Sequence, residues 1–368
     1  MEKRERGFLW KLLVFVLAIL AFIGLIAMAL SVVNPYVNPK HLVWTSFFGL
    51  AFWEIFLFNL LVFIALLLLW SRKVWIAVLA LAIAIPGLKK SYSLGRQKKE
   101  EGFIRVMNYN VHRFSHIDGQ TEEEAFANQL INKVIDNNPD VLCCQEFNAF
   151  KVGVPRNKCI ELFAQKAGFQ YIYYNSKRSF GGNVIFSKYP LHKEMADKGI
   201  GAEITTGGLV SVDAGEKGRF YLANLHLLSF NVTNDEIDVL TNSSELRHQF
   251  DTIGMSVIKK LKYAFDRRAD EIELVLESLE PLDGPIVVCG DFNDTPMSFT
   301  YKRMQDAGFV DSFIKSGRGI KPTFAWKLPL MRIDYIWGNK HIKPLKFKRF
   351  KDKASDHYPI MLDFKIEQ

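Results

Sequence analysis

An unbroken apolar run near the N-terminus, Leu12–Val33, limits what this chain can fold into more than any other feature. The run holds 22 residues and no charged side chain. About 20 such residues are enough for a helix to cross the hydrocarbon core of a bilayer, whereas a cleaved signal peptide has a shorter apolar core before its cleavage site. We therefore expect this segment to be retained as a membrane-spanning helix.

Two further apolar runs follow in the first hundred residues. Trp44–Trp70 is long enough for a second span although Glu54 interrupts it, and Val74–Leu88 has only 15 residues. The short third run fits either a span or a buried or interfacial helix. An acid in a membrane segment points to function by default, but no second charge accompanies Glu54, so we interpret the runs as an anchor. Residues 1–90 are thus predicted to form a membrane anchor with two to three transmembrane helices.

The charge of the chain is concentrated in this anchor. The net charge is +8, and residues 1–100 hold 12 Lys and Arg against 4 Asp and Glu, whereas the remaining 268 residues hold 35 of each. Basic residues that flank membrane spans stay on the cytoplasmic side, which assigns the N-terminal segment and the Arg72–Lys73 turn to the cytoplasm. With three spans, everything after Leu88 then lies outside; with two, it lies in the cytoplasm. We favour an integral membrane protein whose larger part is extracytoplasmic.

Residues 91–102 are polar and basic and are interpreted as a linker, and the pattern changes from residue 103 onward. Short β-rich runs alternate there with amphipathic runs and turn signals, which indicates a domain of mixed strands and helices over residues 103–368. The helical run 258–279 carries many Lys and Arg residues, among them Arg268. We interpret it as a solvated outer helix, with a basic membrane-binding or anion-binding face as the alternative. Strands are expected at 103–110, 141–145, 171–174, 183–186, 209–213, 219–225, 285–289, 332–337 and 360–366, and further helices at 122–137, 159–167 and 301–307.

Polar side chains end or interrupt the apolar strands of this region. The segment Gly290–Pro296 follows an apolar run with an acid, an amide and a second acid, and oxygen ligands of these kinds suit hard divalent cations such as Mg²⁺. Loop residues at the ends of rigid strands are where sites are built. Acids can hold Mg²⁺, amides can bind a phosphate oxygen, and histidines can transfer a proton. The sequence therefore favours phosphate-ester hydrolysis by the set Asn110, Glu146, Asn183, His226, Asp291, Asn293, Asp334, Asp356 and His357.

Seven motifs stand in order between Phe103 and Phe364: Met-Asn-Tyr-Asn-Val, Gln-Glu-Phe, Gly-Asn-Val-Ile-Phe-Ser-Lys-Tyr-Pro, Asn-Leu-His-Leu, Gly-Asp-Phe-Asn-Asp-Thr-Pro, Arg-Ile-Asp-Tyr-Ile and Ser-Asp-His-Tyr-Pro. Their order resembles that of the endonuclease/exonuclease/phosphatase superfamily. This superfamily includes deoxyribonuclease-I-like nucleases, apurinic endonucleases, inositol-polyphosphate phosphatases and neutral sphingomyelinases. Apolar spans before such a domain are similar to the layout of membrane-anchored bacterial members. The resemblance implies an α/β fold, a four-layer α/β sandwich of two packed mixed sheets flanked by helices, with the site at one end.

The resemblance also implies a metal site and phosphate contacts. Glu146 resembles the principal Mg²⁺ ligand of the superfamily, with Asn110 and Asp356 nearby and with Mn²⁺ as an alternative ion. Asn293 matches the amide that contacts the scissile phosphate. We add Asn183 as a further expected contact with the substrate phosphate.

The remaining site residues are expected to handle protons. Asp291 matches the acid that orients or deprotonates the attacking water, and His226 sits where the nuclease and sphingomyelinase branches have a phosphate-contacting or general-acid histidine. Asp334 matches the acid that orients His357, which would hold the phosphate or transfer a proton. The sequence leaves open whether Asp291 or His357 is the base. After the first Asn motif, several nuclease relatives continue with an acid or a Gly-rich segment, whereas this chain has His112-Arg113-Phe114, so a second metal position stays open.

These expectations favour a membrane-anchored, Mg²⁺-dependent phosphodiesterase or phosphatase. A bilayer tether brings lipid headgroups to the site, so phospholipid headgroups or small phosphorylated molecules are the favoured substrates. Residues 101–368 carry no net charge, which weakens the first alternative, a nuclease acting on DNA or RNA, because nucleic-acid binding relies on Lys and Arg contacts with phosphates. The second alternative, an inactive membrane-bound binding module, is disfavoured by the complete set of acids, amides and histidines. The oligomeric state stays open.

Overall fold

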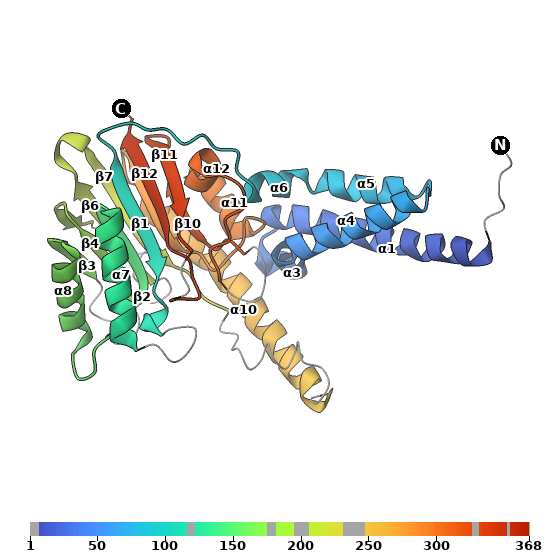
Figure 1. Cartoon of the computed structure of the whole chain (residues 1–368), viewed down its shortest axis with the longest axis horizontal. Helices are drawn as coiled ribbons and strands as arrows, with labels where there is room; N and C mark the ends of the chain where they lie inside the picture. Colours follow the sequence, from blue (N-terminus) through green and yellow to red (C-terminus); the bar gives the residue numbers. More distant parts are fainter. Residues whose placement is uncertain are drawn as a thin grey trace. The chain divides into compact units, whose positions relative to one another are not determined.

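The computed structural model describes residues 7–115, 122–174, 182–194, 206–230, 247–325, 331–351 and 354–367. The chain divides into two units, which are drawn in chain colours in Figure 1. The first, here called the helical unit, comprises Met1–Ser91 together with Thr295–Lys302. The second, here called the sandwich unit, comprises Tyr92–Asp294 and Arg303–Gln368.

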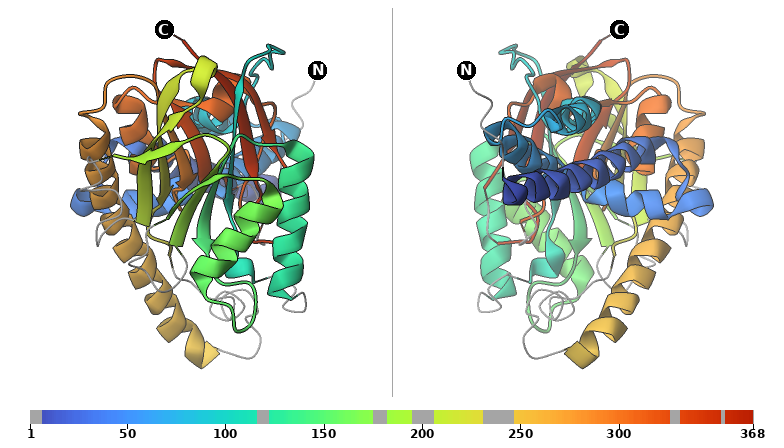
Figure 2. Two further views of the ribbon diagram at one scale, coloured as in Figure 1. Left: turned by 90° about the vertical axis from the view of Figure 1, so that its left-hand side faces the viewer. Right: turned by 90° about the vertical axis from the view of Figure 1, so that its right-hand side faces the viewer.

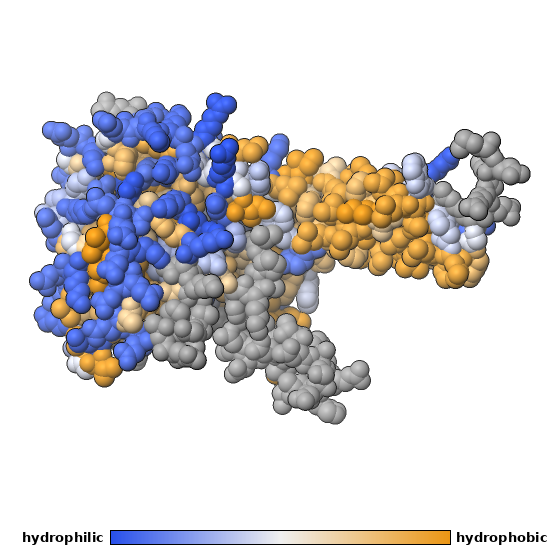
Figure 3. Space-filling view, viewed as in Figure 1, coloured by the Kyte–Doolittle hydropathy of each residue, from blue (hydrophilic) through white to orange (hydrophobic). Residues whose placement is uncertain are grey.

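The helical unit consists of apolar helices, whose surface is largely apolar in Figure 3. Among the described residues, one helix is long and apolar enough to cross a membrane by itself, within Phe8–Tyr36. Helices α3 and α4 qualify only as a pair bent by 69°, and α5 and α6 only as a pair bent by 43°, so the unit offers one span or up to three. The elements are α1 (Phe8–Val33), η1 (Asn34–Tyr36), α2 (Pro39–Leu42), α3 (Trp44–Leu50), α4 (Phe52–Leu68), α5 (Val74–Ile83) and α6 (Ile85–Ser91).

Local residues explain how these helices bend and pack. Pro86 is the second residue of α6, where its ring prevents α5 from continuing straight. Asn59 Nδ2 donates to the Gly24 carbonyl at 3.0 Å and so joins two apolar helices by a polar contact. A Cβ at position 24 would lie 2.5 Å from Asn59 Oδ1, so only glycine fits there. Glu54 lies exposed in the first turn of α4, where the helix dipole stabilises an acid.

The sandwich unit contains two six-stranded sheets. Both are mixed, because β1 and β2 pair in parallel, as do β7 and β8, while the neighbouring pairs are antiparallel. The first sheet has the order β11 (Ile342–Arg349), β12 (Ile360–Ile366), β1 (Ile104–Asn110), β2 (Val141–Phe147), β4 (Gly182–Ser187) and β3 (Tyr171–Tyr174). The second has the order β5 (Leu191–Lys193), β6 (Thr206–Asp213), β7 (Arg219–His226), β8 (Ile286–Asp291), β10 (Asp334–Gly338) and β9 (Val310–Asp311).

Helices cover the outer faces of the two sheets, as Figures 1 and 2 show. The predicted four-layer α/β sandwich is therefore confirmed. The helical elements after β1 are η2 (His112–Phe114), α7 (Glu123–Asn137), α8 (Arg156–Ala167), η3 (Gly215–Lys217), α10 (Arg247–Leu279), α11 (Phe299–Asp306) and α12 (Ser312–Ser316).

Alternating side chains of the strands build two cores. In β1, Val106 points into the core between the sheets and Tyr109 into the core beneath α7 and α8. Burial of both faces explains the nearly continuous apolar runs of these strands. Each fully buried large apolar side chain contributes about 1.5–3 kcal/mol. The core between the sheets includes Cys143, Leu222, Cys289 and Leu362, and the outer core includes Phe126, Leu130, Phe147 and Phe163.

Residues of the predicted linker, 91–102, form hydrogen bonds with the sandwich unit. The backbone N–H of Ser93 donates to the Gly319 carbonyl at 3.0 Å, and that of Lys98 donates to the Leu345 carbonyl at 2.8 Å. Ser93 Oγ also donates to the Gly317 carbonyl at 2.9 Å. These residues therefore form an ordered strip of the sandwich unit rather than a free connection.

Candidate active site

The ends of three neighbouring strands in the second sheet bring an imidazole and two carboxylates together. β7 and β8 pair His226 with Asp291, and β8 and β10 pair Asp291 with Asp334. Neighbouring strands lie about 4.8 Å apart, so the register decides which side chains can meet. Asp291 lies in the middle, and it and Asp334 are almost fully buried.

An amide from the first sheet joins this cluster. Asn110 ends β1, and its Nδ2 donates to Asp291 Oδ2 at 2.9 Å and to Glu146 Oε1 at 3.2 Å. Glu146 lies in β2 at an irregularity between Cys144 and Phe147, and its φ is +53°. Such an irregularity re-aims a side chain that regular alternation would point elsewhere. Residues predicted from both sheets therefore meet at one end of the sandwich.

His357 forms a buried pair with Asp334. Its Nδ1 lies 2.9 Å from Asp334 Oδ2, and its Nε2 lies 3.5 Å from Asp291 Oδ2. Burial disfavours the charged imidazole, but the charges of Asp334 and Asp291 outweigh this and raise the pKa of His357 well above its usual value. Burial raises the pKa of Asp334 to about 6, against the opposing charge of His357. At neutral pH the pair is therefore a protonated imidazole beside an ionised carboxylate.

His226 lies between two carboxylates. Its Nε2 is 3.7 Å from Glu146 Oε1 and 3.8 Å from Asp291 Oδ2, which is beyond hydrogen-bond distance but close enough for attraction. Burial by itself would raise the pKa of Glu146, but the charge of His226 and the hydrogen bond from Asn110 more than offset it and lower that pKa. Glu146 is therefore ionised at neutral pH.

A tight turn after β8 fixes the orientation of Asp291. The backbone N–H of Asn293 donates to Asp291 Oδ1 at 2.8 Å, and Asn293 Nδ2 donates to the Leu227 carbonyl at 3.0 Å. The turn begins at Gly290, where a Cβ would lie 2.2 Å from the Leu225 carbonyl oxygen. Only glycine lets β8 pass so close to β7. One oxygen of Asp291 is thus held by the turn, and contact of Asn293 with a phosphate stays a prediction.

Three buried side chains form one chemically reasonable group of cation ligands. The ligand atoms of Asp291, Asp334 and His357 lie within 4.8 Å of one another. His357 contacts Asp334 through Nδ1 and its raised pKa keeps it protonated. A protonated imidazole has no lone pair for a metal. The trio therefore suits proton chemistry and charge stabilisation better than metal binding.

The set predicted to hold a metal, Asn110, Glu146 and Asp356, fits a hard cation. The side chains of Glu146 and Asp356 are 20% and 28% exposed. This partial exposure leaves space for the water molecules that Mg²⁺ retains in its coordination shell. Ser355 Oγ donates to the Asn110 carbonyl at 2.9 Å and so keeps Asp356 beside the end of β1.

Asn183 lies in a buried amide network next to this cluster. Its Nδ2 donates to the Asn224 carbonyl at 3.1 Å. Gln145 Nε2 donates to Asn108 Oδ1 at 2.7 Å and to Asn224 Oδ1 at 2.6 Å, which links the two sheets. Buried amides bonded in this way stabilise one arrangement of the sheets. The structure thus gives Asn183 a bond to β7, and its contact with a phosphate stays a prediction.

A buried arginine that the sequence did not assign to the site lies beneath the loops after β7 and β8. Arg268 of α10 is fully buried, so its interpretation as part of a solvated face is wrong. Its Nε lies 3.4 Å from Asp294 Oδ2, and its Nη1 donates to the Leu228 carbonyl at 3.0 Å. The guanidinium lies 4.2 Å from the Phe230 ring centre and 5.3 Å from that of Phe265. Arg268 therefore ties the two loops that carry His226 and Asn293 to one helix.

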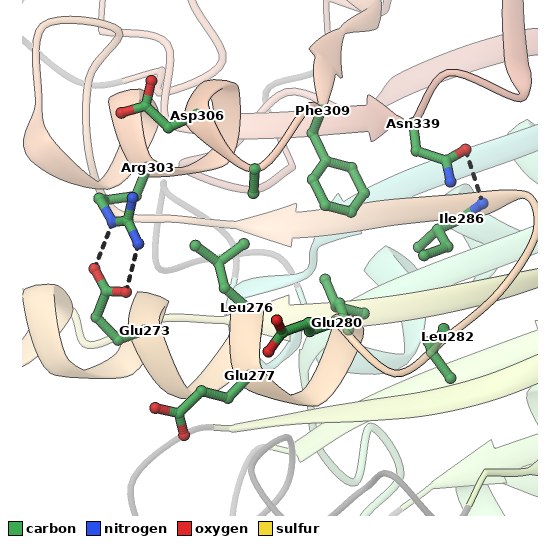
Figure 4. Close-up of a pocket in the computed structure, with 12 residues that line it drawn as sticks. Glu273, Leu276, Glu277, Glu280, Leu282, Ile286, Arg303, Asp306, Phe309 and Asn339 are labelled. Carbon is green, nitrogen blue, oxygen red and sulfur yellow. Dashed lines mark hydrogen bonds and ion pairs between the residues drawn. The ribbon is translucent and has the colours of Figure 1, made fainter.

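A hollow away from the candidate site, shown in Figure 4, lies between α10, α11 and the start of β8. It has a volume of about 550 Å³, and within the described chain it is lined by none of the predicted site residues. Glu277, Glu280 and Asp306 contribute further acids, while Glu273 is paired with Arg303 at 2.5 and 2.7 Å. An acidic lining repels a phosphate ester, so this hollow does not suit the predicted substrate.

Comparison with known families identifies the family to which the sandwich unit belongs. The sequence model of the Endonuclease/Exonuclease/phosphatase family matches residues 107–357, more than half of the chain. The chain belongs to this family. A second match, to a domain of unknown function (DUF8431), covers residues 10–91 and hence the apolar helices of this family member. Among curated proteins, none matches the sequence.

Solved structures are similar to this family member at low identity. An endonuclease/exonuclease/phosphatase from Bacteroides vulgatus is 14% identical over 72% of this chain and 99% of that chain, with a TM-score of 0.52. The catalytic domain of human Nocturnin, with bound sulfate, is 18% identical over 73% and 95% of the two chains, with a TM-score of 0.49. A 3′ phosphatase from Neisseria, bound to a product DNA hairpin, is 16% identical over 71% and 99%, with a TM-score of 0.49.

Proposed function

We propose that this family member is a membrane-anchored, divalent-metal-dependent hydrolase of phosphate esters. The observation that carries the proposal is the bonding of Asn110 to both Glu146 and Asp291. A proposed metal ligand and a proposed water-orienting acid then belong to one hydrogen-bonded cluster. The apolar helix within Phe8–Tyr36 supports the anchor, and the charge balance of residues 101–368 favours phospholipid headgroups or small phosphorylated molecules over nucleic acids as substrates.

The metal and the attacking water are assigned to neighbouring residues. Mg²⁺, or Mn²⁺ as the alternative, held by Glu146 with Asn110 and Asp356, would polarise a phosphoryl oxygen and offset the charge of the transition state. Asp291 orients the water and accepts its proton in this proposal, because its Oδ1 is already fixed by the backbone N–H of Asn293. Its Oδ2 remains beside the amide of Asn110 and can act on the water.

The two histidines receive different roles in this proposal. His357 acts as a cation that stabilises negative charge on the phosphate rather than as the base, because Asp334 and Asp291 keep it protonated at neutral pH. Asp334 orients it through the contact at Nδ1. His226, which lies between two acids, is assigned to the leaving group as proton donor.

The test uses the full chain purified in detergent. It is assayed with Mg²⁺ and with EDTA on an aryl phosphomonoester, a bis-aryl phosphodiester, a choline phospholipid and plasmid DNA. We expect Mg²⁺-dependent turnover of an ester, and a decrease of about 10²-fold or more for Glu146→Gln and for Asp291→Asn. Glu216→Gln, at an exposed acid of η3, is the control and should match the wild type. No turnover of any substrate would refute the proposal, and cleavage of DNA alone would favour a nuclease.

The proposed extracytoplasmic location is tested separately. It rests on three crossings of the membrane and on the basic N-terminal segment and Arg72–Lys73 turn, which the positive-inside rule assigns to the cytoplasm. A C-terminal reporter that is active only in the cytoplasm should therefore stay silent. An active reporter would place the sandwich unit in the cytoplasm and limit the helices to an even number of crossings.

A further inference from the structure

The chain turns sharply directly after the site residue Asn110. His112, Arg113 and Phe114 all have positive φ, at 43°, 55° and 64°. Side chains with a Cβ rarely adopt this conformation, because Cβ then crowds the following carbonyl oxygen. Strained residues of this kind persist only where their surroundings hold them, and they gather at functional sites. The turn is therefore a candidate for a role in the proposed reaction.

Packing and hydrogen bonds hold the turn from both sides. Phe114 is fully buried, and its ring centre lies 4.8 Å from that of Phe147 and 5.5 Å from that of Phe126. The backbone N–H of His112 donates to Asn110 Oδ1 at 3.0 Å. The residue between these two attachments, Arg113, consequently has a fixed backbone although its side chain is exposed.

The turn presents two basic side chains to the proposed metal ligands. Arg113 Nε lies 3.5 Å from Glu146 Oε2, and its side chain is 63% exposed. His112 Nδ1 lies 3.5 Å from Asp356 Oδ1. A guanidinium has five N–H donors in a planar fork, and the contact of Arg113 with Glu146 is made through Nε. The exposed end of the fork is thus available to a ligand that enters beside Glu146.

We propose that Arg113 binds two terminal oxygens of a phosphomonoester, which makes phosphomonoesters the preferred substrate class. This inference rests on the proposed hydrolase function. A phosphomonoester has three non-ester oxygens, whereas a phosphodiester has two. If one oxygen is taken up at the proposed metal site, a monoester still offers a pair of oxygens to the guanidinium fork and a diester offers one. Bidentate contacts with such a fork are the stronger kind.

The charges around the site favour the same substrate class. Four carboxylates lie at the site and repel an incoming phosphate ester, and the permanently charged guanidinium of Arg113 beside Glu146 offsets part of that repulsion. Without Arg113 the repulsion is stronger. This penalty is larger for a dianionic monoester than for a monoanionic diester. The four negative charges are those of Glu146, Asp291, Asp334 and Asp356.

The test compares Arg113→Gln with the wild-type full chain in detergent, assayed with Mg²⁺ on an aryl phosphomonoester and a bis-aryl phosphodiester. Arg219→Gln is the matched control, because Arg219 is 60% exposed and 3.8 Å from Glu194, at the end of β7 opposite His226. Losing hydrogen bonds to a charged group changes rates by about 10- to 100-fold. We expect kcat/KM to fall by that factor for the monoester in Arg113→Gln, and by less than about threefold for the diester. An equal fall for both esters, or an unchanged value for the monoester, would overturn the proposal.

A binding measurement separates this inference from the proposed activity, because it needs no turnover. Calorimetric titration of the wild-type chain should show tighter binding of methyl phosphate than of dimethyl phosphate, and Arg113→Gln should lose this preference. If the wild type hydrolyses neither ester and still shows the preference, the proposed function fails and the role of Arg113 stands. If Arg113→Gln keeps the wild-type preference, the role of Arg113 is refuted whatever the activity.

Discussion

Replacing Asp334 with asparagine removes the charge that faces His357 and keeps the shape of the side chain. The Nδ1 and Oδ2 atoms of the pair are 2.9 Å apart, and both residues are buried. At an effective dielectric constant near 20, two charges at this separation attract each other by roughly 6 kcal/mol before desolvation is subtracted. Removing one partner of a buried pair costs about 3–5 kcal/mol. If the reaction needs the protonated imidazole, the variant should lose about 10²-fold or more in rate at neutral pH.

The pH dependence of the rate provides a second readout of the same pair. The pKa of Asp334 is about 6, so wild-type activity should fall as the pH drops through that value and the carboxylate is neutralised. The pKa of His357 is raised above 6.5, so its positive charge persists at neutral pH and is lost only at higher pH. Its contribution to stability is likewise complete below pH 6.5 and is lost as the pH rises through the folded-state pKa. In Asp334→Asn the acidic decrease should disappear and the basic decrease should move to lower pH.

The assay is kcat/KM for an aryl phosphate ester with Mg²⁺, measured from about pH 5 to about pH 9. Asp363→Asn is the matched control, because Asp363 is also buried and its Oδ1 lies 2.6 Å from Arg105 Nε. Arg105 is near the start of β1, at the end of that strand opposite Asn110. The control should leave the pH profile unchanged. A wild-type rate and an unmoved basic decrease in Asp334→Asn would refute the assigned role of the pair.

Two further substitutions test how the loops of the site are held. Arg268→Met leaves Asp294 without its buried guanidinium partner. We therefore expect the sandwich unit to lose about 3–5 kcal/mol in stability. Unchanged hydrogen-exchange protection in β7 and β8 would contradict this expectation. Gly290→Ala places a Cβ 2.2 Å from the Leu225 carbonyl oxygen, and such overpacking costs about 1–3 kcal/mol. This variant should lower both the unfolding temperature and the activity, and a wild-type unfolding temperature would show that the two strands can separate.

Local sequence patterns predicted several strands and helices at nearly their observed bounds. The expected strands 171–174 and 360–366 coincide with β3 and β12, and the expected helix 122–137 begins one residue before α7. Apolar strands of this kind have a strong periodic signal. Candidate site residues such as Glu146 and Asp291 could be found because acids, amides and histidines end many of the apolar strands together, although each one alone has an ordinary structural explanation. Their convergence depends on strand register, which the sequence did not supply.

Features that depend on distant contacts could not be predicted. β11 was missed because its lysines interrupt the apolar alternation, as is common for an edge strand, where charged side chains prevent pairing with other chains. Arg268 resembles a solvent-exposed residue of a charged helix, since its burial depends on Asp294 and Phe230, which lie far from it in the sequence. The positive φ of Arg113 follows from the burial of the next side chain, and no residue preference predicts it.

One segment shortly after the Asp291–Asn293 turn lies in the helical unit, although it falls beyond residue 103 in the sequence. Thr295–Lys302 belongs to the helical unit, where Asn34 Nδ2 donates to the Met297 carbonyl at 2.7 Å. A chain shortened to residues 103–368 would leave that carbonyl without its donor, which costs about 1–3 kcal/mol for a buried group. It would also expose the Met297 side chain, and both losses would fall four residues after the proposed phosphate contact Asn293. The apolar helices therefore hold the segment into which the turn continues, since Met297 is buried in one cluster with Met28, Phe52 and Ala84.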